Sequence, residues 1–223
     1  MRVFLITGFA LDKRAFAPLR LPEEVFIAVD LIPIRRGESL REYALRLAAE
    51  IGYRPDDVIG GVPLGGMLAL EIAAGLGARG IVLIASAGHP RFIRKRFRWL
   101  SPLAARVPEI LIRNVFRLVP TVLKWRRMLS PQGQALLADI MGKFPPTLLK
   151  AMPSRIMGWR GCLPSAPLRQ IHSEGDWLIR PNGDPAILKL VKGRNHLLTV
   201  SHPEEVREFL FAAVRDFGNQ TSA

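Results

Sequence analysis

The chain has 223 residues, enough for one substantial domain, and 49% of them are hydrophobic, which fits a folded globular protein. Lys and Arg number 32 against 19 Asp and Glu, so the formal net charge is +13 and anionic partners are favoured. The single cysteine, Cys162, excludes a disulfide framework and a cysteine-rich metal site. The four histidines lack metal-ligand spacing, and we expect no metal and no cofactor.

The N-terminus does not have the pattern of a secretory signal. The apolar run at 3–6 is shorter than the apolar core of a signal peptide, and Thr7 and Gly8 end it. No segment approaches the roughly 18 uninterrupted apolar residues that a membrane-spanning helix requires. We therefore expect a soluble, cytoplasmic protein, with peripheral attachment to a membrane surface as an alternative.

Short apolar runs alternate with helix-like segments along most of the chain. In order, the pattern predicts a strand at 3–6, a strand at 25–29, a helix at 40–51, a strand at 57–62, a helix at 64–76, a strand at 81–85, strands at 168–172 and 187–191, and a helix from about 201 to 217. Ser39 and Glu42 form a predicted capping box before the first helix, and Ser201 and Glu204 form one before the last.

This alternation predicts an α/β fold, a three-layer α/β/α sandwich with a mostly parallel sheet that helices cover on both faces. Residues 89–160 differ from the rest, because they are helical in character and are interrupted by prolines, of which the segment contains eight. We predict a core made of residues 1–88 and 161–223, with 89–160 as a basic helical lid inserted between two strands.

The segment Gly61-Val62-Pro63-Leu64-Gly65 joins a predicted strand directly to a predicted helix. It resembles the nucleophile elbow of the α/β-hydrolase superfamily, G-x-S-x-G, in which small residues allow the strand and the helix to approach closely. Here Pro63 stands where the catalytic serine of the family is found.

The resemblance extends beyond the elbow. The loop at Thr7-Gly8-Phe9 is similar to the family's His-Gly loop, with Thr7 in place of the histidine. The stretch that ends at Asp176 is similar to the one that carries the family's catalytic acid, and His196 matches the catalytic histidine. Nucleophile, acid and histidine also follow one another in the family's order.

The resemblance implies a carboxylic-ester or acyl hydrolase fold in which Asp176 and His196 are the acid and the base. It also implies an oxyanion hole made of the backbone N–H groups of Phe9 and Leu64. Pro63 is not a competent nucleophile, because it has no hydroxyl or thiol to attack a carbonyl carbon. Its ring also fixes φ near −65°, whereas an active elbow residue has positive φ, so we expect a relaxed turn.

Other hydroxyl or thiol groups lie outside the elbow. Ser86 follows a strand and could border the pocket, although a hydroxyl that bonds to backbone is the alternative. Cys162 lies in a loop, where a buried or incidental thiol is the common case.

The predicted lid is the most basic part of the chain. From Arg91 to Arg127 there are eleven basic residues and one acid, Glu109, with large apolar side chains between them. This composition suits an anionic membrane surface, or equally a solvated basic face on a lid. No motif for specific nucleic-acid binding is present. The candidate ligand-binding residues of the lid are Trp99, Phe116, Trp125, Met157 and Trp159.

Three functions are consistent with this sequence. The first is a non-hydrolytic or degenerate hydrolase-like protein, a pseudoenzyme that binds an apolar or acyl small molecule under the lid. The second is an enzyme in which Asp176 and His196 act as a general base without a covalent intermediate. The third is a peripheral membrane or interaction protein that works through the basic lid. The sequence does not indicate an oligomeric state.

Overall fold

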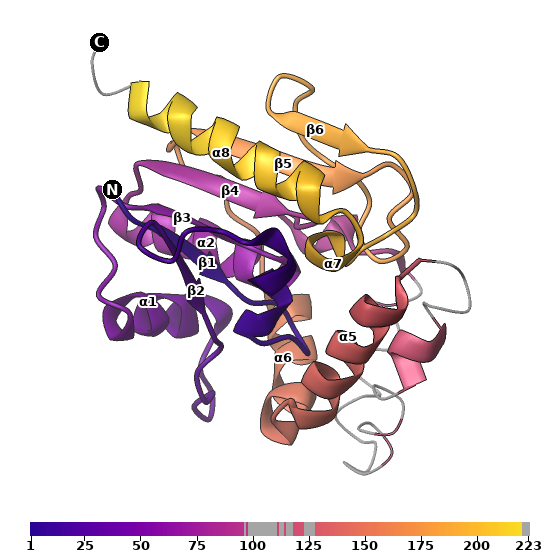
Figure 1. Cartoon of the computed structure of the whole chain (residues 1–223). Helices are drawn as coiled ribbons and strands as arrows, with labels where there is room; N and C mark the ends of the chain where they lie inside the picture. Colours follow the sequence, from indigo (N-terminus) through magenta and orange to yellow (C-terminus); the bar gives the residue numbers. More distant parts are fainter. Residues whose placement is uncertain (96, 98–110, 112–113, 115–117, 123–127, 220–223) are drawn as a thin grey trace.

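A computed structural model describes residues 1–95, 97, 111, 114, 118–122 and 128–219. Its centre is a six-stranded sheet with strand order β2-β1-β3-β4-β5-β6, in which every neighbouring pair is parallel (Figure 1). The strands are β1 (Val3–Ile6), β2 (Phe26–Val29), β3 (Val58–Gly61), β4 (Gly80–Ile84), β5 (Leu168–Ser173) and β6 (Leu188–Val191). The predicted parallel α/β sheet is confirmed.

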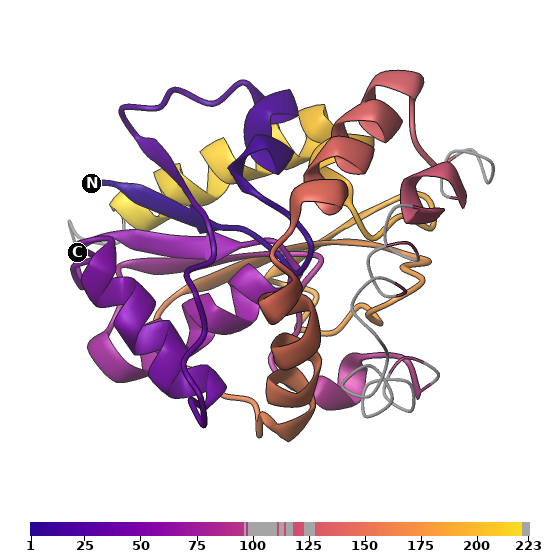
Figure 2. The ribbon, with the colours of Figure 1, turned by 90° about the horizontal axis from the view of Figure 1, so that it is seen from below.

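The strand residues explain why the sheet is covered on both faces. Every residue of β1, β3 and β4 is buried, which is the pattern of central parallel strands between two helical layers. The helices α1 (Leu40–Glu50) and α2 (Pro63–Leu76) lie on one face. The 3₁₀ helix η1 (Lys13–Leu19) and α8 (Pro203–Asn219) lie on the other (Figure 2).

The capping box before α1 forms as predicted. The Ser39 hydroxyl accepts a hydrogen bond from the Glu42 backbone N–H, and the Glu42 carboxylate accepts one from the Ser39 N–H. Both orphan donors at the start of the helix are thereby satisfied.

The last helix begins differently from the prediction. A short helix, α7 (Leu198–Ser201), precedes α8, and α8 itself begins at Pro203. The expected capping box with Ser201 and Glu204 is therefore wrong. Ser201 is the last residue of α7, where its hydroxyl donates to the carbonyl of Leu197, and His202 is the residue directly before α8. The apolar stripe of α8 is buried as expected: Val206, Phe209, Leu210, Ala213 and Phe217.

Two further helices, α5 (Pro131–Lys143) and α6 (Pro146–Gly158), come between β4 and β5 in the chain. They lie beside the carboxyl ends of the strands, and α5 packs near η1 (Figure 1). A short 3₁₀ helix, η2 (Pro90–Phe92), begins the segment after β4. These helices belong to the region that the sequence predicts as a lid.

Candidate active site

The site lies beyond the carboxyl ends of β3, β5 and β6, where parallel α/β sheets commonly carry their ligand-binding residues. Asp176 follows β5 and is completely buried. Its Oδ1 accepts hydrogen bonds from the backbone N–H groups of Leu178 (2.7 Å) and Ile179 (3.0 Å). These two bonds fix the carboxylate and direct Oδ2 toward histidine.

His196 forms the expected pair with this carboxylate. Its Nδ1 lies 2.8 Å from Asp176 Oδ2, and only 4% of the residue is exposed. When Nδ1 carries the proton, it donates a hydrogen bond to the carboxylate. Nε2 is then the ring nitrogen that can accept a proton. The sequence places these two residues 20 positions apart, and the structure brings them together.

The loop that carries His196 is tied to the loop that carries Asp176. Gly193, with φ of +116°, presents its carbonyl to both the Ser173 hydroxyl (2.7 Å) and the Gly175 N–H (2.9 Å). A positive φ favours glycine at this position, and the two bonds hold the two loops in register.

A second histidine approaches the same carboxylate. His172 in β5 is completely buried, and its Nδ1 lies 3.5 Å from Asp176 Oδ2. Neither ring nitrogen forms a hydrogen bond within the described part of the chain. Burial lowers the pKa of His172 to about 4, because desolvation outweighs the attraction of Asp176. His172 therefore stays neutral at physiological pH.

The elbow has relaxed, as its sequence predicts. Val62 is extended, with φ of −91° and ψ of 159°, and Pro63 is the first residue of α2. Pro63 is not among the residues with positive φ. Proline suits this position, because its missing N–H is one that the first turn of a helix leaves unpaired anyway. Residue 63 thus continues into the helix without the strained conformation of an active elbow.

The elbow glycines are required by close packing of the sheet against α2. A Cβ on Gly61 would lie 2.2 Å from the Ile6 carbonyl oxygen, and one on Gly65 would lie 2.0 Å from the same atom. The close approach expected from the resemblance is therefore present, although the nucleophile is missing.

Ser86 follows β4 and bonds to the elbow. It is completely buried, and its hydroxyl donates to the carbonyl of Pro63 at 2.6 Å. The preceding residue, Ala85, has φ of +49°, a conformation that costs free energy for alanine. The hydroxyl is already used in bonding to backbone, which is the structural alternative considered for this serine.

The candidate oxyanion residues come from the turn after β1 and from the start of α2. Phe9 is the second residue of a turn that the Leu11 N–H closes on the Gly8 carbonyl at 3.1 Å. A Cβ on Gly8 would lie 3.2 Å from Pro63 Cδ, so this turn packs directly on the proline ring. Leu64 is the second residue of α2 and is buried.

Sequence reasoning missed two neighbours of the acid. The Arg94 guanidinium donates from Nε to the Asp176 carbonyl at 2.9 Å, and Arg94 N–H donates to Leu178. The Trp177 ring packs edge-on against His196, with 5.4 Å between ring centroids. Arg94 lies 82 positions from Asp176, so no local pattern indicates this contact. Trp177 adjoins Asp176 in the sequence, which is the only available signal.

Trp159 and Cys162 lie around a buried glutamate on α2. The Trp159 indole donates to Glu71 Oε1 at 2.5 Å, and Arg41 bonds to Oε2 at 3.2 Å. Burial raises the pKa of the Cys162 thiol to about 12, and Glu71 adds to the effect. Cys162 is therefore a protonated thiol and a poor nucleophile.

The remaining lid candidates are divided between the described and the undescribed parts of the chain. Met157 lies on α6, is partly buried and packs against the core. Trp99, Phe116 and Trp125 lie outside the described residues, as does most of the basic segment Arg91–Arg127.

Neither a metal centre nor a membrane-spanning helix is present among the residues that the structure describes. There, the His, Cys, Asp and Glu side chains form no group that could hold a metal ion. In the same residues, no helix has both the length and the apolar character needed to cross a bilayer.

A family model described as the alpha/beta hydrolase family matches residues 3–209. The chain therefore belongs to the α/β hydrolase family. A search of curated protein sequences gives no match.

Solved structures support the same fold. An esterase from Thermogutta terrifontis, with malate bound, is 18% identical, with 97% of this chain and 90% of that chain covered and a TM-score of 0.74. MenH from S. aureus is 15% identical, with 97% and 94% covered and a TM-score of 0.72. The enol-lactonase from Burkholderia xenovorans LB400 is 12% identical, with 96% and 91% covered and a TM-score of 0.72.

Proposed function

We propose that this chain is a non-hydrolytic member of the α/β hydrolase family that binds a small apolar or acyl-bearing molecule beneath the helices following β4. The observation that carries the proposal is Pro63 at the nucleophile position, as the first residue of α2. A site without a nucleophile can still bind a molecule that an active relative would cleave.

The two groups that the sequence offers as alternatives, Ser86 and Cys162, do not replace the missing nucleophile. Ser86 donates its hydroxyl to the Pro63 carbonyl, and the raised pKa of Cys162 keeps that thiol protonated. A water molecule activated by His196 would lack the covalent step that divides acyl transfer into two easier reactions.

The retained parts of the site support this class of ligand. The Asp176–His196 pair offers a polar group for a carbonyl or carboxyl oxygen, and the ring of Trp177 offers apolar surface beside it. Two structural neighbours are named as an esterase and an enol-lactonase, which supports an acyl group as the recognised feature.

Hydrolysis can be tested with p-nitrophenyl butyrate. We expect no release of p-nitrophenol above the buffer rate from the wild-type chain. Pro63→Ser supplies a hydroxyl and frees φ, so it should gain a low esterase activity. The double variant Pro63→Ser/His196→Ala should lose that gain, because the serine then has no base. Wild-type hydrolysis that depends on His196 would overturn the proposal.

Binding can be tested in the same sample with methyl butyrate and saturation-transfer NMR. The proposal predicts transfer from the protein to the ester without formation of methanol. The variant Trp177→Phe removes the indole beside His196 and should change the transfer pattern. Absence of any transfer would contradict ligand binding, and methanol formation would contradict the non-hydrolytic role.

A second candidate function is supported by the intact buried pair. His196 Nδ1 and Asp176 Oδ2 are 2.8 Å apart, the geometry that orients a histidine as a general base. An enzyme of this kind would show an activity that depends on pH and is abolished by His196→Ala, with Pro63→Ala leaving it intact.

A further inference from the structure

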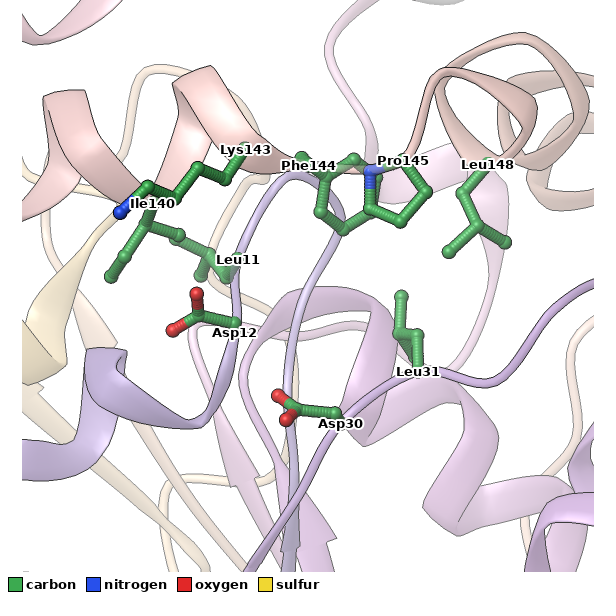
Figure 3. Close-up of a pocket in the computed structure, with 9 residues that line it drawn as sticks. All are labelled: Leu11, Asp12, Asp30, Leu31, Ile140, Lys143, Phe144, Pro145 and Leu148. Carbon is green, nitrogen blue, oxygen red and sulfur yellow. The ribbon is translucent and has the colours of Figure 1, made fainter.

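A second candidate site lies away from the Asp176–His196 pair. It is a cavity of about 230 Å³ at the carboxyl ends of β1 and β2, beneath α5 and α6 (Figure 3). The lining residues are Leu11, Asp12, Asp30, Leu31, Ile140, Lys143, Phe144, Pro145 and Leu148. Figure 3 shows Asp12 and Asp30 on the side of the sheet and the residues of α5 and α6 facing them.

The cavity is separate from the candidate active site. Neither Pro63, Asp176 nor His196 lines it. The two regions meet where Phe144, which lines the cavity, packs edge-on against Phe9 of the oxyanion turn, with 5.8 Å between ring centroids. A ligand in this cavity therefore does not need the nucleophile, and an inference about it goes beyond the proposed function.

Two of the three charged groups that line the cavity already have partners. Asp12 Oδ2 is 2.6 Å from Arg14 Nη2, and Lys143 Nζ is 2.7 Å from Asp139 Oδ1. Arg14 also pairs with Asp139, so these four side chains form one network of two positive and two negative charges.

Asp30 is the third charged residue of the lining, and it does not belong to this network. Its Oδ1 accepts a hydrogen bond from the Lys13 backbone N–H at 2.6 Å. Within the residues that the structure places, no side chain forms an ion pair with it. Among the described residues this carboxylate thus has no cationic partner, and it lies at the mouth of an apolar cavity, where a negative charge favours a cationic ligand.

The rest of the lining is apolar. Leu11, Leu31, Ile140, Phe144 and Leu148 offer hydrocarbon and aromatic surface, and Leu11, Ile140, Phe144 and Leu148 are buried. A volume of 230 Å³ has room for about seven groups of the size of a water molecule. A chain of about six carbons with one polar end has that size.

We propose that this cavity binds a short-chain primary alkylamine, with the ammonium group at Asp30 and the hydrocarbon chain against the leucine, isoleucine and phenylalanine side chains. Burial of methylene groups supplies most of the affinity. The exposed ion pair supplies the preference for an amine, and such pairs contribute little, so the preference is severalfold. A carboxylate of the same chain length carries a negative charge, which Asp30 would repel.

The test compares hexylamine, hexanol and hexanoate on the full chain, with dissociation constants from titrations followed by methyl NMR. We expect hexylamine to bind about threefold to fivefold more tightly than hexanol, and hexanoate to bind most weakly. The methyl signals of Ile140 and Leu148 should shift on binding, which places the ligand in the cavity.

Asp30→Asn is the decisive variant, because an asparagine oxygen still accepts the Lys13 hydrogen bond. It should abolish the preference for hexylamine and leave hexanol binding unchanged. Asp56→Asn is the matched control, since it removes the same charge from a site that does not line this cavity. Equal binding of amine and alcohol, equal loss in both variants, or shifts elsewhere than at Ile140 and Leu148 would overturn the proposal.

Discussion

Proline at position 63 changes the backbone of the elbow as well as its chemistry. An active elbow holds its nucleophile at positive φ, where a proline ring does not fit. Here Val62 is extended and α2 begins at Pro63, so the chain avoids the conflict by starting the helix at the proline. The missing hydroxyl and the relaxed turn have the same cause.

His172 has a pKa well below that of a histidine in water. It shares Asp176 with His196, yet it stays neutral because it is completely buried. A folded-state pKa below the unfolded value means that the unfolded chain takes up a proton first as the pH falls. The neutral His172 side chain therefore contributes to the free energy of unfolding above about pH 6.5. This contribution is lost as the pH falls from about 6.5 to about 4.

We predict that His172→Gln makes stability less dependent on pH. Between pH 7 and pH 4 the free energy of unfolding of the wild-type chain should fall by about 3 kcal/mol more than that of the variant. Urea unfolding at both pH values measures the difference. His89→Gln, a change at a half-buried histidine outside the pair, serves as the control and should behave like the wild type. An unchanged pH dependence in His172→Gln would contradict the prediction.

Among the elements, β1, β3 and α2 form the tightest contact near the site. The Ile6 carbonyl of β1 points into the space left by Gly61 and Gly65, and a side chain at either glycine would overlap it. Glu71 on α2 also binds the indole of Trp159, which follows α6. Helix α2 thus connects the sheet to the end of the helical segment after β4.

Gly65→Ala should destabilise the fold through this contact. The added Cβ would lie 2.0 Å from the Ile6 oxygen, and backbone atoms of two central elements must move to accommodate it. We expect a loss of about 3 kcal/mol in the free energy of unfolding, at the upper end for overpacking. Gly158→Ala is the control, because no atom lies within 4 Å of the new Cβ and a gain of up to about 1 kcal/mol is expected. Equal effects of the two substitutions in urea unfolding would refute the account.

For the whole molecule, the dominant electrostatic feature is the net charge of +13. Net +10 of it comes from the basic segment between residues 91 and 127. We propose an anionic membrane surface as a partner of this segment, since each basic residue near such a surface contributes about 1 kcal/mol.

The whole chain should therefore bind vesicles that contain phosphatidylserine at low ionic strength. Binding should disappear in 1 M salt, where the Debye length is about 3 Å, and should be absent on phosphatidylcholine vesicles. Co-sedimentation with vesicles measures both effects. Equal binding to the two kinds of vesicle, or binding that persists in 1 M salt, would rule out this electrostatic mechanism.

Much of the fold and part of the site could be predicted because their signals are local. The strand at 3–6 is a short apolar run, Ser39 and Glu42 are three residues apart, and Gly61, Pro63 and Gly65 are contiguous with their strand and helix. Asp176 and His196 were found through their resemblance to a family pattern. The Arg94–Asp176 contact could not be found, since it joins positions 82 apart and depends on how the insertion folds back.

The amino-acid sequence by itself determined that the elbow has no nucleophile and that helices and parallel strands alternate, since side-chain chemistry and backbone preference act over a few residues. Only the tertiary structure decided that His172 and His196 share one carboxylate, that Ser86 bonds to the elbow, and that Asp30 lies at an apolar cavity without an ion-pair partner among the residues described. These features depend on distances between residues far apart in the chain, which are fixed when the sheet and its helices pack together.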